Sequence, residues 1–139
     1  MTNAGDIGGA VKVSAEGDTT QGSSTGEPID RRYLARFTLG NMALEREVLE
    51  LFAGQMPRYV EQLRAAANGK EWMLAAHTIK GSALAVGARR LASLAQMAER
   101  LDMDAYPADC ENMRRDATNA VAAASNEACL FIACLFATD

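Results

Sequence analysis

The chain contains one histidine, His77, followed three residues later by Lys80 and four residues later by Gly81. On a helix, the offsets i, i+3 and i+4 place these side chains on one face. Neutral imidazole is a nucleophile, and histidine titrates near physiological pH. An ammonium one turn away disfavours the imidazolium form and can later offset the charge of an anion taken up by the ring. This arrangement suits a histidine that accepts a phosphoryl group.

A lone histidine on a helix flank is more often just a half-exposed polar residue. The neighbouring residues favour a chemical role. Lysine and glycine at both offsets would coincide by chance roughly once in a few hundred cases at average residue usage. A glycine inside a helix costs about 1 kcal/mol relative to alanine, so we expect Gly81 to leave room for an incoming group. Ser82 can donate a hydrogen bond there, although a helical serine more often bonds its own backbone.

Two apolar residues share the face of His77, namely Met73 at i−4 and Leu84 at i+7. A change at either residue is expected to weaken the docking of a partner protein. Such a partner is not nucleic acid, because 14 basic and 18 acidic residues give a net charge of −4 without a basic excess.

Several other kinds of site lack the residues they need. The three cysteines, Cys110, Cys129 and Cys134, have an odd count and spacings that fit neither a disulfide framework nor a metal clip, so reduced thiols are expected. One histidine is too few for a Cys/His zinc cluster. The N-terminal glycines lack the Lys-Ser/Thr of a phosphate-binding loop. We therefore expect no metal and no cofactor in this chain.

The periodicity of apolar residues predicts which elements position His77. Long helices are expected over about 42–67, 70–86, 88–103 and 109–136, with a short helix from the N-cap Asp30 to about Leu39. Helix formers dominate the composition and no strand pattern competes. The predicted fold is all-α, an antiparallel four-helix bundle with a short leading helix and a disordered N-terminal segment.

The apolar stripes and helix breakers refine this prediction. Asn68-Gly69 is predicted to end the long helix, Gly87 to end the third, Tyr106-Pro107 to form a turn, and Pro57 to kink the long helix or loosen its preceding turn. The predicted core positions are Tyr33, Leu34, Phe37, Leu44, Val48, Leu51, Phe52, Met56, Tyr59, Val60, Leu63, Trp72, Ala76, Ile79, Ala83, Val86, Leu91, Leu94, Ala95, Ala98 and Leu101.

The two ends of the chain differ from the middle. Residues 1–28 hold six of the eleven glycines and few large apolar side chains, so we expect a disordered leader, with the bundle over 29–139. Ala128–Ala137 is apolar on all sides, which predicts partial burial and leaves a homodimer contact open. This stretch is half the roughly 20 residues of a membrane span, and no secretory signal is visible. A cytoplasmic protein without a membrane segment is expected.

The stretch from Ala76 to Ala83, followed by Gly87-Ala88 and Leu91, resembles the motif of histidine-containing phosphotransfer (HPt) domains. The likeness extends over about residues 28–103. It implies a monomeric bundle that carries phosphate between receiver domains in a multistep two-component phosphorelay. By the same resemblance, His77 is the phosphorylated residue, and Lys80 and Gly81 are the lysine and small neighbour of the motif.

The resemblance also implies a carboxylate or amide on the following helix that contacts the imidazole. By motif offset this residue is Glu99, with Gln96 as the alternate. A carboxylate that accepts from Nδ1–H would leave Nε2 as the nucleophile. The position of Leu84 is commonly small in similar proteins, so this leucine puts the breadth of partners in question.

The implied partners are receiver domains of response regulators and the receiver of a hybrid histidine kinase, which would bring the magnesium ion. On this reading the chain has no ATPase or autokinase activity. A rival interpretation is a non-catalytic helical module that binds receivers or dimerises, in which His77 is incidental. A third, the phosphotransfer input of a chemotaxis-type kinase, is disfavoured because no kinase domain accompanies the motif.

Overall fold

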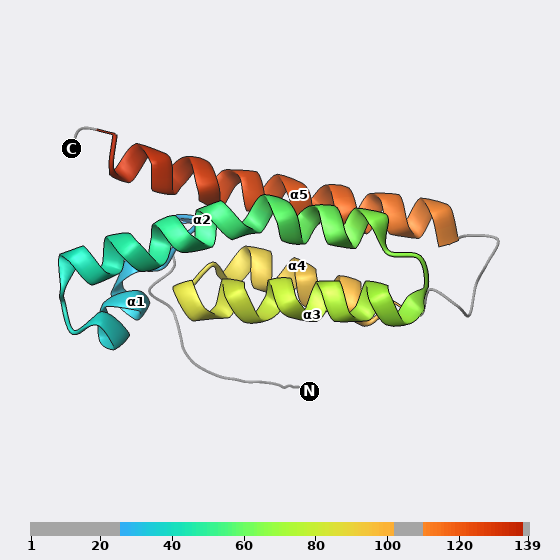
Figure 1. The fold of residues 1–139 in the computed structure, drawn as a ribbon, viewed down its shortest axis with the longest axis horizontal. Helices are drawn as coiled ribbons and strands as arrows, with labels where there is room; N and C mark the ends of the chain where they lie inside the picture. The colour runs from blue at the N-terminus through green and yellow to red at the C-terminus, as the bar shows by residue number, and fades with distance from the viewer. Residues whose placement is uncertain (1–25, 102–109, 138–139) are drawn as a thin grey trace, which may run out of the picture.

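The structure, a computed structural model, describes residues 26–101 and 110–137. Its helices are α1 (Arg31–Thr38), α2 (Met42–Ala65), α3 (Gly69–Val86), α4 (Arg89–Glu99) and α5 (Cys110–Leu135), and these two ranges include no strand. Figure 1 shows α2 and α5 on one side of the bundle and α3 and α4 on the other, with successive helices antiparallel. The predicted all-α fold, a four-helix bundle with a short leading helix, is confirmed.

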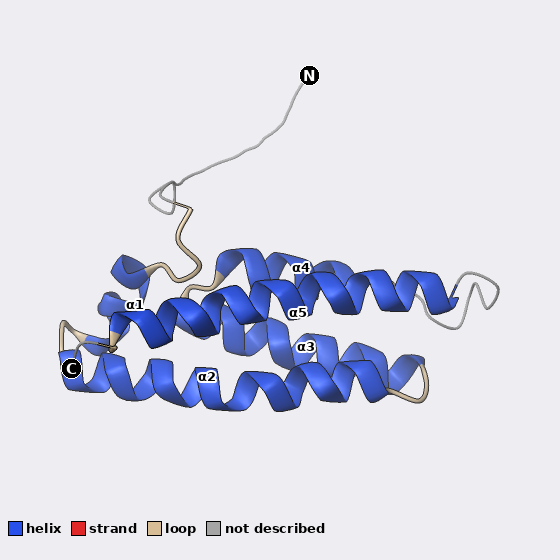
Figure 2. Ribbon diagram, turned by 90° about the horizontal axis from the view of Figure 1, so that it is seen from above, coloured by secondary structure: helices blue, strands red, loops and turns tan. Residues whose placement is uncertain are grey.

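Each long helix packs on two neighbours, in the order α2, α3, α4, α5 around the bundle. The leading helix α1 lies at the end where α2 begins and contacts α2 and α3 (Figure 2). Most of the predicted leader, up to residue 25, lies outside the described residues, as do Met103 and the predicted turn at Tyr106-Pro107. The division between leader and bundle stays a prediction, although Ile29 is already fully buried.

The α3–α4 turn holds α1 in place through Gly87. This glycine has φ of 76°, and its N–H donates to the carbonyl of Leu84 while the N–H of Ala88 donates to that of Ala83. These two bonds form a Schellman motif, which confirms Gly87 as the end of α3. The carbonyl of Gly87 then accepts from the N–H of Asp30 at 2.9 Å. Asp30 itself caps α1, as predicted.

Two predicted helix boundaries are wrong. Asn68 does not end the long helix; its side chain accepts from the N–H of Glu71 at 2.9 Å and begins α3, while α2 has already ended at Ala65. An asparagine oxygen suits a helix start as well as Asn-Gly suits a helix end. The fourth helix ends at Glu99, not near Met103, because the N–H of Leu101 turns to the carbonyl of Ala98 in a tighter i to i−3 bond.

Pro57 lies inside α2, which runs without interruption on both sides of it. Proline has no N–H, so the carbonyl of Ala53 one turn earlier loses its usual helical partner. The thiol of Cys129 on α5 lies 3.8 Å from this oxygen and donates to it. Burial raises the pKa of the Cys129 thiol, so it keeps the proton that it donates. A cysteine of the neighbouring helix thus replaces the hydrogen-bond donor that the proline lacks.

The core contains most of the predicted positions, with three clear exceptions. Leu44, Leu51 and Phe37 are exposed, whereas Leu49, which the predicted stripe omitted, is fully buried. The buried positions of α2 are Glu45, Leu49, Phe52, Met56, Val60 and Leu63. They alternate in steps of three and four residues, so Leu44 and Leu51 fall one position outside the buried line.

The C-terminal end of α5 is partly buried, as the sequence predicts. Ala128 and Ile132 are buried, whereas Leu130 and Cys134 are exposed. Length and composition would let Glu111–Leu135 cross a membrane, and this stretch is longer than the apolar end Ala128–Ala137. This helix packs against α2 and α4, and a core helix of a soluble bundle passes the same test.

Candidate functional site

The buried line of α3 determines where His77 points. This helix directs Trp72, Ala75, Ala76, Ile79, Ala83 and Val86 into the core. His77 falls on the flank of that line, and its side chain is 62% exposed. Lys80, one turn further along α3, is more enclosed, with 24% of its side chain exposed. The imidazole therefore stands on an open helix face, where another protein can reach it.

Glu99, at the end of α4, contacts both of these side chains. Its Oε2 lies 2.9 Å from Nδ1 of His77, and its Oε1 lies 2.8 Å from Nζ of Lys80. The two contacts join α3 and α4 through one carboxylate. Oε1 is shielded from solvent. Its negative charge is therefore balanced by the ammonium of Lys80 and not by water.

The two contacts keep Glu99 ionised. The ammonium of Lys80 is the largest cause that lowers the pKa of Glu99 below its ordinary value of 4.5, and the contact with His77 lowers it further. Partial burial of the carboxyl opposes this shift and is the smaller effect. At neutral pH the residue is therefore an anion that accepts hydrogen bonds and cannot donate one.

An ionised Glu99 determines the tautomer of a neutral His77. Since the carboxylate only accepts, Nδ1 must carry the proton and donate it across the 2.9 Å contact. The lone pair of the neutral ring then lies on Nε2, on the far side of the imidazole. The arrangement presents a nucleophilic nitrogen at the surface, with an anion behind the ring.

The other predicted site residues occupy the surroundings of the ring. Gly81 is exposed, and a methyl group placed on it would meet no atom within 4 Å. Met73 and Leu84 are each half exposed on α3. Ser82 is partly buried beside Gly81.

Gln96, the alternate partner of the imidazole, lies one turn before Glu99 on α4 and is partly buried. The contact to Nδ1 comes from Glu99. The roles given to all these residues stay predictions.

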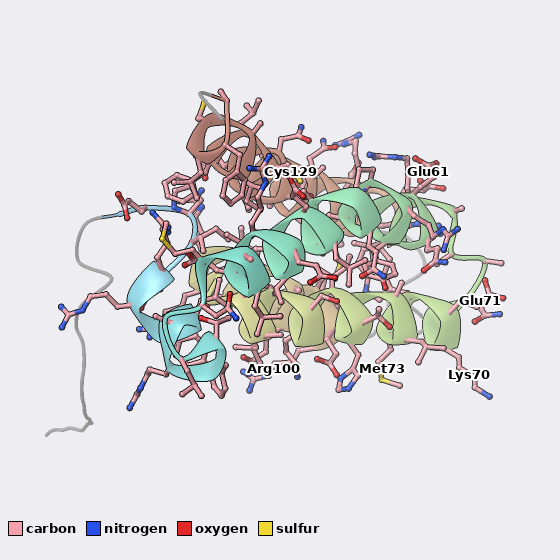
Figure 3. All side chains as sticks on the ribbon, turned by 60° about the vertical axis from the view of Figure 1, so that its left-hand side comes forward. Glu61, Lys70, Glu71, Met73, Arg100 and Cys129 are labelled. Carbon is pink, nitrogen blue, oxygen red and sulfur yellow. The ribbon has the colours of Figure 1, made fainter. Side chains whose placement is uncertain are left out.

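The structure also exposes residues on α3, on α4 and just after α4 that the sequence pattern did not single out. Leu74 on α3 and Met97 on α4 are large apolar residues with more than half of their surface exposed. In Figure 3, Lys70 and Met73 of α3 project from the same side of the bundle as Arg100, which follows α4. The signal available in the sequence was weak, because exposed apolar and basic residues at helix ends are common.

A second missed feature is the indole of Trp72, which was predicted only as a core residue. Its Nε1–H donates to the carbonyl of Ala98 at 2.8 Å. Since Ala98 precedes Glu99, this bond fastens α3 to the turn that carries the carboxylate. No periodicity within one helix reveals such a contact between helices.

Together, the antiparallel bundle and its surface imidazole fit one class of protein, the phosphocarriers that use histidine. The family model described as Hpt domain matches residues 47–127, more than half of the chain. The chain therefore belongs to the Hpt domain family, and the resemblance read from the residues around His77 is confirmed. The match begins after the short leading helix and extends into α5. No curated protein and no solved structure gave a significant match.

Membership of the family establishes the general function. Hpt domains are phosphocarriers rather than enzymes, and they take part in phosphotransfer in two-component systems. They interact with the receiver domains of response regulators, and they are generally soluble.

Proposed function

We propose that this chain relays a phosphoryl group between aspartate receiver domains by way of a phosphohistidine at His77. The observation that carries the proposal is the contact between Nδ1 of His77 and Oε2 of Glu99 on an exposed helix face. It supports a ring whose nucleophilic Nε2 is free and accessible. The upstream donor would be a receiver such as that of a hybrid histidine kinase, and the acceptor would be a response regulator.

The transfer is an in-line displacement at phosphorus. Nε2 of His77 attacks the aspartyl phosphate of the donor receiver, a P–N bond forms, and the P–O bond to the aspartyl group breaks. The electron pair of that bond leaves with the aspartate carboxylate. Nδ1 keeps its proton, so the ring becomes cationic, and the carboxylate of Glu99 offsets this charge at 2.9 Å. Attack by a second receiver's aspartate on the phosphohistidine reverses these steps and restores neutral His77.

Lys80 and Gly81 serve the phosphorylated state in this account. The ammonium of Lys80 can turn from Glu99 towards the phosphoryl oxygens, since it lies one turn from His77 on the same helix. The open space above Gly81 admits those oxygens and the receiver that carries them. We assign magnesium to the acidic pocket of the receiver, and no cofactor to this chain.

The docking surface in this proposal surrounds the imidazole with apolar residues. Met73 and Leu84 on α3 supply half-exposed apolar side chains on either side of His77, and Ser82 and Gln96 lie near the edge. Desolvation of such side chains at the centre of an interface supplies much of its binding energy. A monomeric cytoplasmic carrier, with a homodimer through the apolar end of α5 as the alternative, completes the proposal.

The test is the transfer of label from a panel of phosphorylated receiver domains to the wild-type chain and to His77→Gln. The proposal expects acid-labile, alkali-stable label on the wild type alone, and onward transfer to a second receiver. Receiver binding should be nearly unchanged in His77→Gln and weaker in Met73→Ala and Leu84→Ala. Binding without any label on the wild type would instead support the rival function, a docking module in which His77 is incidental.

A further inference from the structure

The indole of Trp72 joins α3 to the last turn of α4 inside the core. The Nε1–H donates to the carbonyl of Ala98 at 2.8 Å, and each of these two residues is only 1% exposed. Trp72 precedes His77 by five residues on α3, and Ala98 is adjacent to Glu99 on α4. One buried hydrogen bond therefore connects the helix of the imidazole to the turn of its carboxylate partner.

The last turn of α4 depends on contacts from outside the helix. The final carbonyls of any helix have no partner within it. At the other end, the N-cap position Ala88 offers no side-chain hydrogen bond. The carbonyl of Ala98 accepts from the N–H of Leu101 at 3.1 Å, and its second lone pair accepts from Trp72. The indole hydrogen bond therefore fixes the position of the last turn of α4 along the axis of α3.

The position of this turn along α3 determines whether Glu99 can contact both His77 and Lys80. A carboxylate that contacts Nδ1 of His77 at 2.9 Å and Nζ of Lys80 at 2.8 Å tolerates little displacement. N–H···O hydrogen bonds keep donor and acceptor within about 2.7–3.2 Å, and they weaken steeply when the angle at the hydrogen falls below about 120°. A buried indole N–H that lost its acceptor would carry a large desolvation cost. The cost of breaking that bond opposes any sliding of α4 along α3.

We propose that Trp72 is a positioning residue that sets the tautomer of His77 by holding Glu99 in register. Trp72 touches neither the phosphoryl group nor the reacting nitrogen; it acts through Ala98 and Glu99. The part of this inference that concerns transfer rests on the proposed function. The part that concerns the tautomer does not, because it is a property of the unphosphorylated chain.

The chain is well suited to the test because it contains one tryptophan and one histidine. Replacing tryptophan during expression by benzothienylalanine, which has sulfur in place of the ring N–H, removes the donor and nearly preserves the shape. Nitrogen-15 spectra of the single imidazole then report its tautomer directly. The expected result is a loss of the Nδ1–H tautomer from nearly full to mixed occupancy. Phosphoryl transfer from a receiver is expected to slow about fivefold, the effect of one net hydrogen bond.

Two variants separate positioning from general loss of stability. Trp72→Phe also lacks the donor and should shift the tautomer in the same direction. Phe52→Leu removes core volume on α2, a helix that packs against α1, α3 and α5, and should leave the tautomer unchanged. An unchanged tautomer in the benzothienyl protein, or an equal shift in Phe52→Leu, would overturn the inference. A shifted tautomer with unchanged transfer would uphold the positioning of Glu99 and count against its proposed part in transfer.

Discussion

The ammonium of Lys80 lies 2.8 Å from Oε1 of Glu99, so the lysine is engaged before any phosphoryl group arrives. From the sequence alone, this lysine is expected to act on the imidazole and on the incoming phosphate. The structure adds a third partner and makes Glu99 the centre of the site, since its other oxygen contacts His77. A substitution of Lys80 should therefore change the pKa of Glu99 even before any phosphoryl group is bound.

The first prediction concerns the pKa of Glu99. Lys80→Met removes the largest cause of its lowered pKa, so the pKa should rise towards 4.5. His77→Gln removes a smaller cause and should raise the pKa less. Carbon-13 NMR titration of the carboxyl group measures both shifts. A larger rise in His77→Gln than in Lys80→Met would contradict this order of causes.

The second prediction concerns the pH dependence of stability. Because the pKa of Glu99 is lower in the folded chain than its ordinary value of 4.5, ionised Glu99 favours folding. This contribution is present above about pH 4.5 and is lost as the pH falls through the folded pKa. Urea unfolding should show Glu99→Gln less stable than the wild type at neutral pH. The difference should shrink as the pH falls below 4.5 and through the folded pKa of Glu99. A difference that stays constant or grows in acid would refute the prediction.

The third prediction separates helix stability from access to the ring. Gly81→Ala places a methyl group in open space on α3, so the free protein should become about 0.5–1 kcal/mol more stable. The same methyl group would meet a docked receiver, and transfer should slow about tenfold, as expected for overpacking at a close contact. Thermal unfolding and transfer rates measure the two effects.

Gly54→Ala is the matched control for that variant. Gly54 is exposed inside α2, and a methyl group there also meets nothing within 4 Å. It should stabilise the chain to a similar degree without slowing transfer. Equal transfer rates in both variants would mean that the space above Gly81 has no part in docking.

The fourth prediction concerns the α3–α4 turn. Gly87→Ala places an alanine in the left-handed backbone conformation and brings its Cβ to 2.9 Å from the carbonyl oxygen of Asp30. Gly40 has φ of 78° but open surroundings, so Gly40→Ala bears only the left-handed cost, about 1 kcal/mol. Gly87→Ala should cost about 1–3 kcal/mol more. Chemical denaturation measures the free energy of unfolding of both variants. An equal decrease in the two would show that Asp30 moves away from the new methyl group without a cost in stability.

Much of the fold follows from local sequence patterns. The caps at Asp30 and Gly87 and the buried line of α3 were predicted because each depends on residues within one or two turns. On α2, the apolar pattern wrongly places Leu44 and Leu51 in the core, each one position before a buried residue. Apolar character alone does not show which side of a helix contacts its neighbours.

The candidate site divides in the same way. The proximity of Lys80 and Gly81 to His77 follows from helix geometry, and the partner Glu99 was implied by the resemblance to HPt domains. The bond from Trp72 to the carbonyl of Ala98 joins residues 26 positions apart and depends on how two helices pack. The contact of Cys129 with Ala53 is likewise between helices, so neither bond leaves a local pattern.

The position of the phosphoryl group after transfer shows directly which atom of the chain is the nucleophile. Nitrogen-15 and phosphorus-31 NMR of the chain, phosphorylated by a receiver, identify the modified atom of its single imidazole. In-line attack by the free nitrogen should leave phosphate on Nε2 of His77, with Nδ1 still protonated against Glu99. Phosphate on Nδ1, or on a residue other than His77, would contradict it.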